Sequence, residues 1–557
     1  MRQMSWWQQG GACTVWLGLV SCLVLAPSVG AQTATTPSSA DLDAGKQLYI
    51  QHCTHCHNDT GDGKGAAAEV VYPKPRDFTN GTYKFRTRHE TADGNKLASD
   101  DDILRSINDG LHGTSMPAWR GFLTKPQMLQ LVHYIKTFAP VFKDDKPGAG
   151  LDVSGEIAPT PASIAKGKEH FEKTFECHTC HGMAGRGNGQ QALDGLKDDW
   201  GERIWPANLT KPWTYRGGQA RRDIFRNISL GIGGTPMPAF MDPDPMQTAR
   251  TATDPQKKKD AEAMAREVRD NIWHTVNYVQ SLWTAPAEPD VQSVLMAQLV
   301  DGPLPTGPDD PAWKTVPRNY YPLVGQVIED PRLFHPLSVG AEVQALHNGK
   351  EIAFRFVWDD RTESKPGGSG AQQVFADAFA LQLPARHGEG ATRPYFLMGD
   401  AKHPTDLWYW RNDVPDKGAV IQTTGSKTFQ PKEPGGGLSA QGVADNGQYR
   451  VVMQRSLRTK NASKEVQFGV GTFMSFSLTA WDGSNGEQGG GKRTVTSWYT
   501  LYLEPEPSKA PLYLALTGIA VGLVIEFSAL FATRKQYRRS EAAQASGADA
   551  GAPKTSA

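Results

Sequence analysis

Two short clusters place cysteine and histidine at the same spacing, Cys53-Thr54-His55-Cys56-His57 and Cys177-His178-Thr179-Cys180-His181. In each cluster, C-x-x-C-H presents two thiols and one imidazole from a single short turn. Such thiols can add to the vinyl groups of a haem, and the histidine can then bind the iron, so the pattern is the attachment signature of a c-type haem. The sequence therefore predicts two covalent haem c groups, held by Cys53, Cys56 and His57 and by Cys177, Cys180 and His181.

A methionine follows each cluster in the same local setting, Gly-Thr-Ser-Met116-Pro-Ala and Gly-Thr-Pro-Met237-Pro-Ala. A thioether ligand raises the potential of a haem, and the proline after it stiffens the loop by fixing φ. The predicted axial pairs are His57 with Met116 and His181 with Met237, and the alternatives left open are His112 and Met241.

An internal repeat surrounds these motifs, with one copy at residues 41–143 and the other at 162–285. Gly45 matches Gly167, and residues 102–110 match residues 223–231. Copies of this size suit small all-α domains in which the haem forms much of the core. Both copies resemble class I cytochromes c nearly end to end, which implies electron transfer at irons with no open position. Arg86 and Arg216 also occupy matching places, where an arginine could pair with a haem propionate or be solvated.

The composition limits the number of domains and the kinds of partner and cofactor that the chain can have. A chain of 557 residues should hold about three to four domains. Its net charge of +0 gives no large basic face, so nucleic acid is not expected as a partner. Of the six cysteines, only Cys13 and Cys22 lie outside the two clusters. If the N-terminal segment is removed, no thiolate remains to hold an iron–sulfur cluster.

Residues 313–505 have a different sequence pattern from the two repeat copies. Alternating segments rich in β-branched and aromatic residues are separated there by glycine-rich breaks. Examples are residues 352–358, 379–383, 449–453 and 494–501. This pattern predicts a mainly-β sandwich of antiparallel strands. The region has no cysteine, so a haem there would be non-covalent.

Four stretches of this region resemble the haem b subunit of ethylbenzene dehydrogenase and related molybdenum enzymes of the dimethyl sulfoxide reductase family. They are Trp358-Asp359-Asp360, Tyr395 to Asp400, Asp406 to Trp410, and Ala480-Trp481-Asp482-Gly483 with Gly491-Lys492. The resemblance implies one haem b, with Met398 and Lys492 as its axial ligands. A lysine ligand must be neutral, which requires burial. His347, His387 and His403 remain alternative ligands.

Apolar segments lie at both ends of the chain. Residues 1–31 read as a signal peptide, with an uncleaved anchor, or a lipoprotein signal that ends at Cys22, as the alternatives. Residues 511–532 are apolar enough to span a bilayer. Arg534, Lys535, Arg538 and Arg539 follow directly, and such residues mark the cytoplasmic side. The sequence therefore predicts a single C-terminal span in a bacterial cytoplasmic (inner) membrane, a cytoplasmic tail at 533–557 and haem domains in the periplasm.

Together these motifs predict a membrane-anchored multihaem electron-transfer subunit. The resemblance implies a molybdenum enzyme with an iron–sulfur subunit as one partner, and other cytochromes as further partners. One alternative is a dihaem enzyme of the peroxidase type, which would need an iron with a displaceable ligand. Another is a dihaem cytochrome whose β-sandwich binds a ligand such as a carbohydrate.

Overall fold

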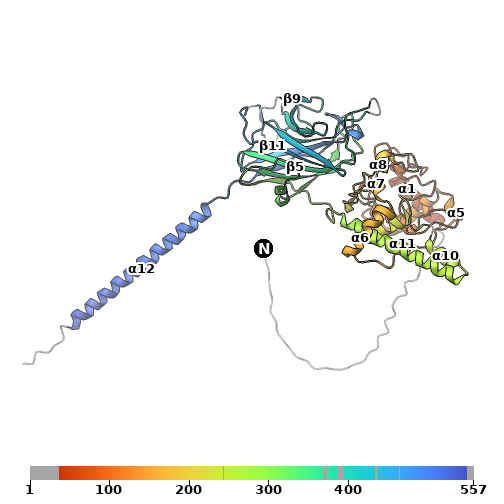
Figure 1. Cartoon of the computed structure of the whole chain (residues 1–557), viewed down its shortest axis with the longest axis horizontal. Coiled ribbons are helices and arrows are strands. Elements are labelled where there is room, and N and C mark those ends of the chain that lie inside the picture. The colour runs from red at the N-terminus through yellow and green to blue at the C-terminus, as the bar shows by residue number, and fades with distance from the viewer. Residues whose placement is uncertain are drawn as a thin grey trace, which may run out of the picture.

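A computed structural model describes residues 37–242, 244–368, 373–386, 393–432, 437–462 and 464–548 (Figure 1). It contains two helical domains, a β domain and a long C-terminal helix, α12 (Ala510–Ala548). The predicted fold class of two all-α domains, one mainly-β domain and one C-terminal apolar helix is therefore confirmed. The predicted signal peptide at 1–31 lies outside the described residues, as do Cys13 and Cys22.

The two helical domains repeat one plan, in which a short helix carrying the C-x-x-C-H motif follows a longer one. The first domain contains α1 (Ser39–His52), α2 (Thr54–His57), α3 (Asp100–Asp109), α4 (Lys125–Lys136) and α5 (Val141–Asp144). The second contains α6 (Pro161–Glu169), a π-helical turn (His170–Thr174), α7 (His178–His181), α8 (Gln190–Gly195), α9 (Arg221–Leu230), α10 (Pro245–Thr251) and α11 (Pro255–Ser281).

The glycines matched in the repeat, Gly45 and Gly167, lie where two helices cross. A Cβ atom on Gly45 would lie 2.2 Å from the Gln130 carbonyl oxygen of α4, and one on Gly167 would lie 2.0 Å from the His274 carbonyl oxygen of α11. No side chain fits at these distances, so glycine allows α1 to pack on α4 and α6 to pack on α11. Each crossing fixes the helix that leads into a C-x-x-C-H turn.

A buried ion pair joins the two helical domains. Arg86 Nη2 lies 2.6 Å from Asp242 Oδ2, and both side chains are almost completely buried. The other Asp242 oxygen accepts from the Glu90 N–H at 2.9 Å, and Arg86 also donates to the Leu230 carbonyl at 2.8 Å. Burial raises the pKa of Asp242, but the His89 imidazole, 3.5 Å away, and hydrogen bonds from Glu90 and Arg86 outweigh it, so the net pKa is lowered.

We expect Arg86→Gln to lower the free energy of unfolding by roughly 3–5 kcal/mol, because it leaves the Asp242 carboxylate buried without its cation. Asp242 contributes stability above its unfolded pKa, and this is lost as pH falls through its lowered folded pKa. The acid-side loss of stability should therefore shrink in the variant. Urea unfolding at several pH values measures both effects.

Arg105 provides the matched control, since it pairs with Asp223 across the same two domains at 2.6 Å but is 42% exposed. Arg105→Gln should cost about 1 kcal/mol or less. Equal losses in the two variants would show that burial of the Arg86 pair is not what stabilises the interface.

The β domain is a 14-stranded sheet in which most neighbours are antiparallel. Its main path runs β10-β11-β5-β4-β1-β14-β12-β6-β7-β8-β9. The strands are β1 (Val294–Leu299), β2 (Asn319–Pro322), β3 (Val324–Gly325), β4 (Gly340–His347), β5 (Glu351–Asp359), β6 (Ala378–Pro384), β7 (Thr405–Arg411), β8 (Gly418–Thr423), β9 (Gln430–Lys432), β10 (Ser439–Asp445), β11 (Gln448–Ser456), β12 (Phe473–Trp481), β13 (Thr494–Val495) and β14 (Tyr499–Leu503).

The sheet folds back on itself into two layers. Phe379 of β6 lies 4.9 Å from Phe356 and 4.6 Å from Trp358 of β5, measured between ring centroids, although these strands are far apart in the strand order. The aromatic side chains of both layers meet in one buried core. Segments 352–358, 379–383 and 449–453 lie in β5, β6 and β11, as the alternating pattern predicts.

Two features of the sheet differ from the prediction. The first strand, β1, is parallel to both of its neighbours, β4 and β14, because long connections rather than hairpins lead to it. It also lies before residue 313, the predicted start of the domain. Residues 494–501 form no single strand, since β13 ends at Val495 and β14 begins at Tyr499.

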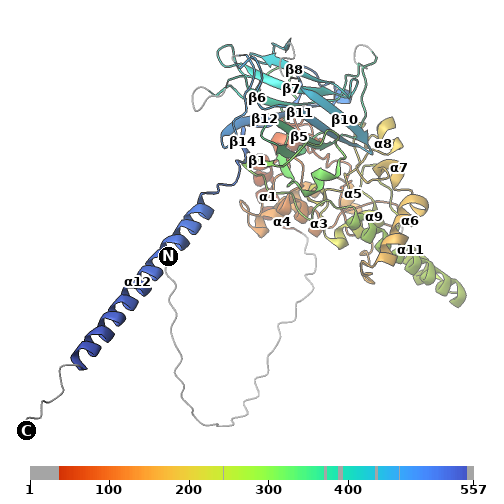
Figure 2. The ribbon, with the colours of Figure 1, turned by 60° about the vertical axis from the view of Figure 1, so that its left-hand side comes forward.

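Helix α12 stands apart from the rest of the chain, as Figures 1 and 2 show. In the described part of the chain, residues 510–545 form the one helix that is long and apolar enough to cross a membrane, and its most apolar 18-residue window has a mean hydropathy of 2.1. Its apolar side chains are exposed along its length. The predicted span at 511–532 lies within it.

Candidate haem sites

Each C-x-x-C-H motif forms one turn of helix, α2 or α7. His57 N–H donates to the Cys53 carbonyl at 2.9 Å, and His181 N–H donates to the Cys177 carbonyl at 2.8 Å. The chain then reverses at a residue with positive φ, Asn58 at 63° in the first domain. The turn therefore presents both thiols and the imidazole from one short segment, as the motif predicts.

Both histidines are held in the orientation that an iron ligand needs. His57 Nδ1 lies 3.0 Å from the Arg76 carbonyl oxygen, and His181 Nδ1 lies 3.0 Å from the Ala207 carbonyl oxygen. A proton on Nδ1 that donates to the carbonyl leaves Nε2 with its lone pair free for a metal. Burial lowers the pKa of both histidines, which favours the neutral, ligating form.

The four thiols of the motifs remain available. Cys53, Cys56, Cys177 and Cys180 are free, half-buried cysteines, and they form no disulfide in the described part of the chain. Burial raises the pKa of Cys53 and of Cys177 to about 12, so these thiols stay protonated. The donor set of each turn fits the two thioether bonds and one imidazole ligand of a haem c.

The two methionine loops are nearly superimposable in their hydrogen bonds. Met116 N–H donates to Thr114 Oγ1 at 3.1 Å, and Met237 N–H donates to Thr235 Oγ1 at 3.3 Å. The Met116 carbonyl accepts from Leu111 at 3.1 Å, and the Met237 carbonyl accepts from Ile232 at 3.4 Å. Both side chains are half-buried.

The rival ligands differ from these methionines in burial. Met241 is 6% exposed and packs in the core of the second domain. His112 is exposed. Met116 and Met237 therefore remain the predicted ligands.

A group of half-buried cations lies near the two histidines. Arg76 stacks on Trp200 of the second domain, 3.9 Å from the ring centroid, and its Nη1 and Nη2 atoms are buried without a hydrogen-bond partner. Burial lowers the pKa of Arg76 to about 10. Burial and then the charges of Arg76 and Arg216 lower the pKa of Lys84 to about 7.

Arg361 of the β domain reaches the second histidine. Its guanidinium lies 5.4 Å from the centroid of the Trp205 ring, and its charge acts on His181. In the described part of the chain, Arg361 has no ion pair and no hydrogen bond. Half-buried cations without an acidic partner near both C-x-x-C-H turns fit a group that brings its own carboxylates, as the propionates of a haem do.

Residues 42–139 and 164–283 match the cytochrome c family, and residues 310–436 match the ethylbenzene dehydrogenase family. The chain carries two cytochrome c domains and one ethylbenzene dehydrogenase domain. Cytochrome c domains carry covalent haem and transfer electrons, so this is a multihaem electron-transfer chain. The ethylbenzene dehydrogenase match includes Met398 and ends before Lys492.

Three relatives are similar to parts of the chain. A heme subunit of respiratory nitrate reductase from Haloferax mediterranei is 27% identical over 221 residues, which are 40% of this chain and 76% of the relative. The cbb3-type cytochrome c oxidase subunit FixP of Azorhizobium caulinodans is 26% identical over 197 residues, 35% of this chain and 52% of the relative. A chain of a reducing HAO-like protein complex from Kuenenia stuttgartiensis is 33% identical, with 43% of this chain and 96% of that chain covered and a TM-score of 0.37.

In the ethylbenzene dehydrogenase domain, the loops of Met398 and Lys492 meet through one serine. The Met398 carbonyl accepts from the Gly425 N–H at 2.8 Å. The next residue, Ser426, accepts from Arg493 Nη2 at 3.1 Å and donates to the Leu397 carbonyl at 3.5 Å. Two loops far apart in the sequence are therefore held side by side.

Met398 has a backbone that methionine rarely adopts, with φ at 69°, and such outliers cluster at functional sites. Its side chain is fully buried, whereas Lys492 is half-buried. Arg493 Nε is buried without a partner, and a propionate could satisfy it. These features fit a non-covalent haem between the two loops.

The alternative histidines have other contacts. His347 is buried, and its Nε2 lies 2.9 Å from the Glu504 carbonyl oxygen. His403 is half-buried, and its Nδ1 lies 3.3 Å from Asp400 Oδ2. His387 lies outside the described residues.

Of the two matched arginines, Arg86 is engaged by Asp242 and backbone carbonyls, while Arg216 belongs to the cation group. The residue that sequence reasoning missed is Arg361, because nothing in its local sequence marks an arginine that reaches another domain. Arg76 and Lys84 were also missed.

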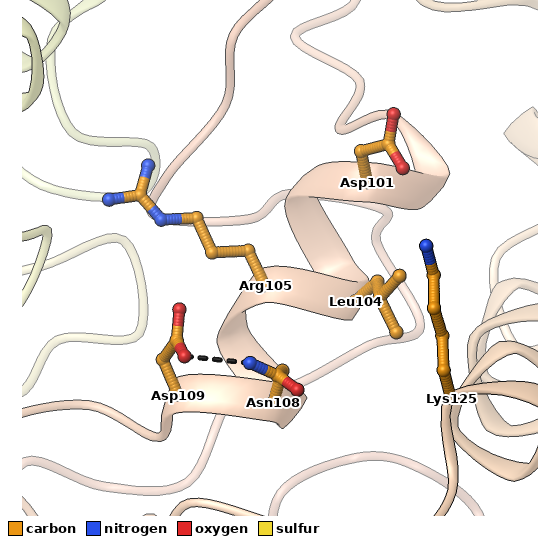
Figure 3. Close-up of a pocket in the computed structure, with 6 residues that line it drawn as sticks. All are labelled: Asp101, Leu104, Arg105, Asn108, Asp109 and Lys125. Atoms are coloured by element: carbon orange, nitrogen blue, oxygen red, sulfur yellow. Dashed lines mark hydrogen bonds between the residues drawn. The ribbon is translucent and has the colours of Figure 1, made fainter. Parts of the chain in front are cut away.

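A surface hollow of about 320 Å³ over α3 contains none of these ligands. It is lined by Asp101, Leu104, Arg105, Asn108, Asp109 and Lys125 (Figure 3). Figure 3 shows Arg105 pointing away from Asp101 and Lys125, and its guanidinium binds Asp223 of the second cytochrome c domain. The hollow therefore lies at the edge of the interface between the two cytochrome c domains.

Proposed function

We propose that this chain is a membrane-anchored, periplasmic subunit that carries electrons between a molybdenum oxidoreductase and the respiratory chain or another cytochrome. The observation that carries the proposal is the matched pair of haem c turns, each with a methionine loop, joined to an ethylbenzene dehydrogenase domain. The chain is similar to a heme subunit of respiratory nitrate reductase and to a chain of an HAO-like complex, and this similarity supports a role as a subunit of an oxidoreductase assembly.

In this proposal His57 and Met116 are the axial ligands of the first haem c, and His181 and Met237 are those of the second. The haem supplies a one-electron carrier whose potential depends on its axial ligands and burial. The protein holds each imidazole through Nδ1 and stiffens each methionine loop with proline. With two protein ligands on each iron, no position is left for a substrate, which favours conduction over a peroxidase activity.

The half-buried cations Arg76, Lys84, Arg216 and Arg361 would bind the haem propionates. They come from three domains and lie near one another, since the charges of Arg76 and Arg216 act on Lys84 and that of Arg216 acts on Arg361. The arrangement would allow these cations to hold the carboxylates of both haems. It also makes the third domain part of the second haem site.

We expect Arg361→Gln to lower the midpoint potential of one haem c. A positive charge beside a haem disfavours the ferric form, which carries one more positive charge than the ferrous form. Removing that charge therefore stabilises the ferric state. Spectroelectrochemical titration of the full chain measures the change, and Arg361→Lys should keep the wild-type potential.

Arg318 is the matched control, since it lies in the same domain with its side chain 63% exposed. Arg318→Gln should leave both potentials unchanged because solvent screens its charge. If Arg361→Gln also leaves both unchanged, Arg361 does not contribute to a haem site.

The ethylbenzene dehydrogenase domain would hold one haem b between Met398 and Lys492. This domain would dock on the iron–sulfur subunit of the partner, and the cytochrome c domains would connect to other cytochromes. Helix α12 would be the membrane span in the bacterial cytoplasmic membrane, with the basic residues after it on the cytoplasmic side and residues 1–31 as the export signal.

A pyridine haemochrome spectrum of the purified full chain tests the cofactor content. The proposal predicts haem c and haem b in a ratio of about two to one. If the spectrum shows haem c alone, the domain has no haem b site. The protein would then be a dihaem cytochrome whose β-sandwich has another role. The proposed molybdenum partner is tested by purifying the chain from membranes without detergent exchange and measuring the molybdenum content. A complex without molybdenum would contradict the proposed partner.

A further inference from the structure

Three buried aspartates come together in the ethylbenzene dehydrogenase domain where strands begin and end. Asp360 follows β5, Asp377 precedes β6 and Asp482 follows β12. Their exposed fractions are 3%, 0% and 1%. One carboxylate oxygen from each lies within 4.8 Å of the other two, so three segments distant in sequence bring negative charge to one point.

Each carboxylate is held in place from outside the cluster. Asp377 accepts from the Gly483 N–H at 2.7 Å, and its other oxygen accepts from the Tyr449 hydroxyl at 2.7 Å. Asp482 Oδ1 accepts from the Ser484 N–H at 2.9 Å. These bonds fix how the carboxylates point without neutralising them.

Two oxygens of the cluster have no partner. Asp360 Oδ2 and Asp482 Oδ2 are buried, and neither accepts a hydrogen bond. A buried acceptor that is left unsatisfied is costly, and an uncompensated buried charge costs more. Each lies on a carboxylate whose Oδ1 is already engaged, so both are left free for a ligand that accepts lone pairs.

No cation of the described chain balances this charge. None of the three aspartates forms an ion pair with a lysine or arginine in the described residues, and Arg361 acts on Asp482 only as a more distant charge. The ion-free cluster is therefore electrostatically unfavourable as it stands.

We propose that Asp360, Asp377 and Asp482 bind one calcium ion. The ligands are all oxygens, which suits a hard cation rather than zinc or copper. Calcium–oxygen bonds of about 2.3–2.6 Å let one ion bridge carboxylate oxygens that lie up to 4.8 Å apart. Because β5 lies in one layer of the sandwich and β6 in the other, the ion ties the two layers together.

The ion would also steady the contact with the second cytochrome c domain. Asp360 lies between Asp359 and Arg361, and both neighbours face that domain. Asp359 Oδ2 lies 2.7 Å from Lys211 Nζ and accepts from Asn208 at 2.9 Å. A calcium ion at Asp360 would therefore anchor the docking segment at its middle residue.

The test uses the full haem-loaded chain after dialysis against a chelator. Adding calcium at about 100 times its dissociation constant should raise the thermal unfolding midpoint of the β domain by roughly 5–10 °C. Elemental analysis of the reloaded protein should give about one calcium per chain. In Asp360→Asn and Asp482→Asn, the calcium-dependent rise in the midpoint should be lost or strongly reduced.

Asp406→Asn is the control, because Asp406 is a buried carboxylate of the same domain that already has a cation, with Lys432 Nζ at 2.7 Å. It should lower the midpoint yet keep the full response to calcium. The proposal is overturned if calcium neither binds nor raises the midpoint of the wild-type chain, if the two Asn variants respond like wild type, or if only magnesium stabilises the protein.

Discussion

Replacing Met237 with alanine is expected to produce a reduced protein that binds carbon monoxide at about one of its two c haems. In the wild type the proposed thioether fills the sixth position of the iron, and a methyl group cannot. Loss of the soft ligand should also lower the midpoint potential of that haem, since the choice of axial ligands sets the potential of a haem over a range of about 0.8 V. Difference spectra with carbon monoxide and a redox titration measure both effects.

Met241 gives the control within the same loop region. Met241→Ala should cost roughly 2–5 kcal/mol of stability, because it empties a buried core position, but it should not create a carbon monoxide site. The reverse result, with carbon monoxide binding in Met241→Ala alone, would make Met241 the ligand. The same comparison in the first domain sets Met116→Ala against His112→Ala.

Replacing Lys492 with alanine is expected to remove the non-covalent haem and leave the two covalent haems in place. The iron would lose one of its two protein ligands, and no thioether bond would retain the porphyrin. Met398→Ala should have the same effect from the opposite side. The haem b content per chain, measured as pyridine haemochrome against the covalent haem, reports the loss directly.

Lys402 is the control for this experiment, because it is an exposed lysine only a few residues after Met398. Lys402→Ala should retain haem b in full. Retention of haem b in Lys492→Ala, together with its loss in His403→Ala, would move the second ligand to His403 and contradict the assignment carried over from the family.

Much of the helical half could be predicted from the sequence because its determinants are local. C-x-x-C-H requires one turn of helix, and the paired loops of Met116 and Met237 share the same threonine and proline. Gly45 and Gly167 could be matched by alignment of the repeat, although the reason for them, a helix crossing too close for a Cβ atom, is visible only in three dimensions.

The rest could not be predicted because it depends on contacts between domains. Asp242 binds Arg86 across 156 positions of sequence, and no pattern links the two residues. Arg361 looks like any polar residue after a strand, yet its charge acts on His181 of another domain. The aspartates at 360 and 482 were noticed as parts of family motifs, while their convergence with Asp377 depends on how the sheet folds over.

The connection between the body of the protein and α12 has a mechanical consequence. The last strand ends at Leu503 and the helix begins at Ala510, and the residues between them are mostly exposed. A connection of this length can extend to about 20 Å at most. With α12 in a bilayer, this connection would keep the end of β14 within about 20 Å of the start of the helix, so a partner that binds this edge of the β domain would also lie close to the lipid surface.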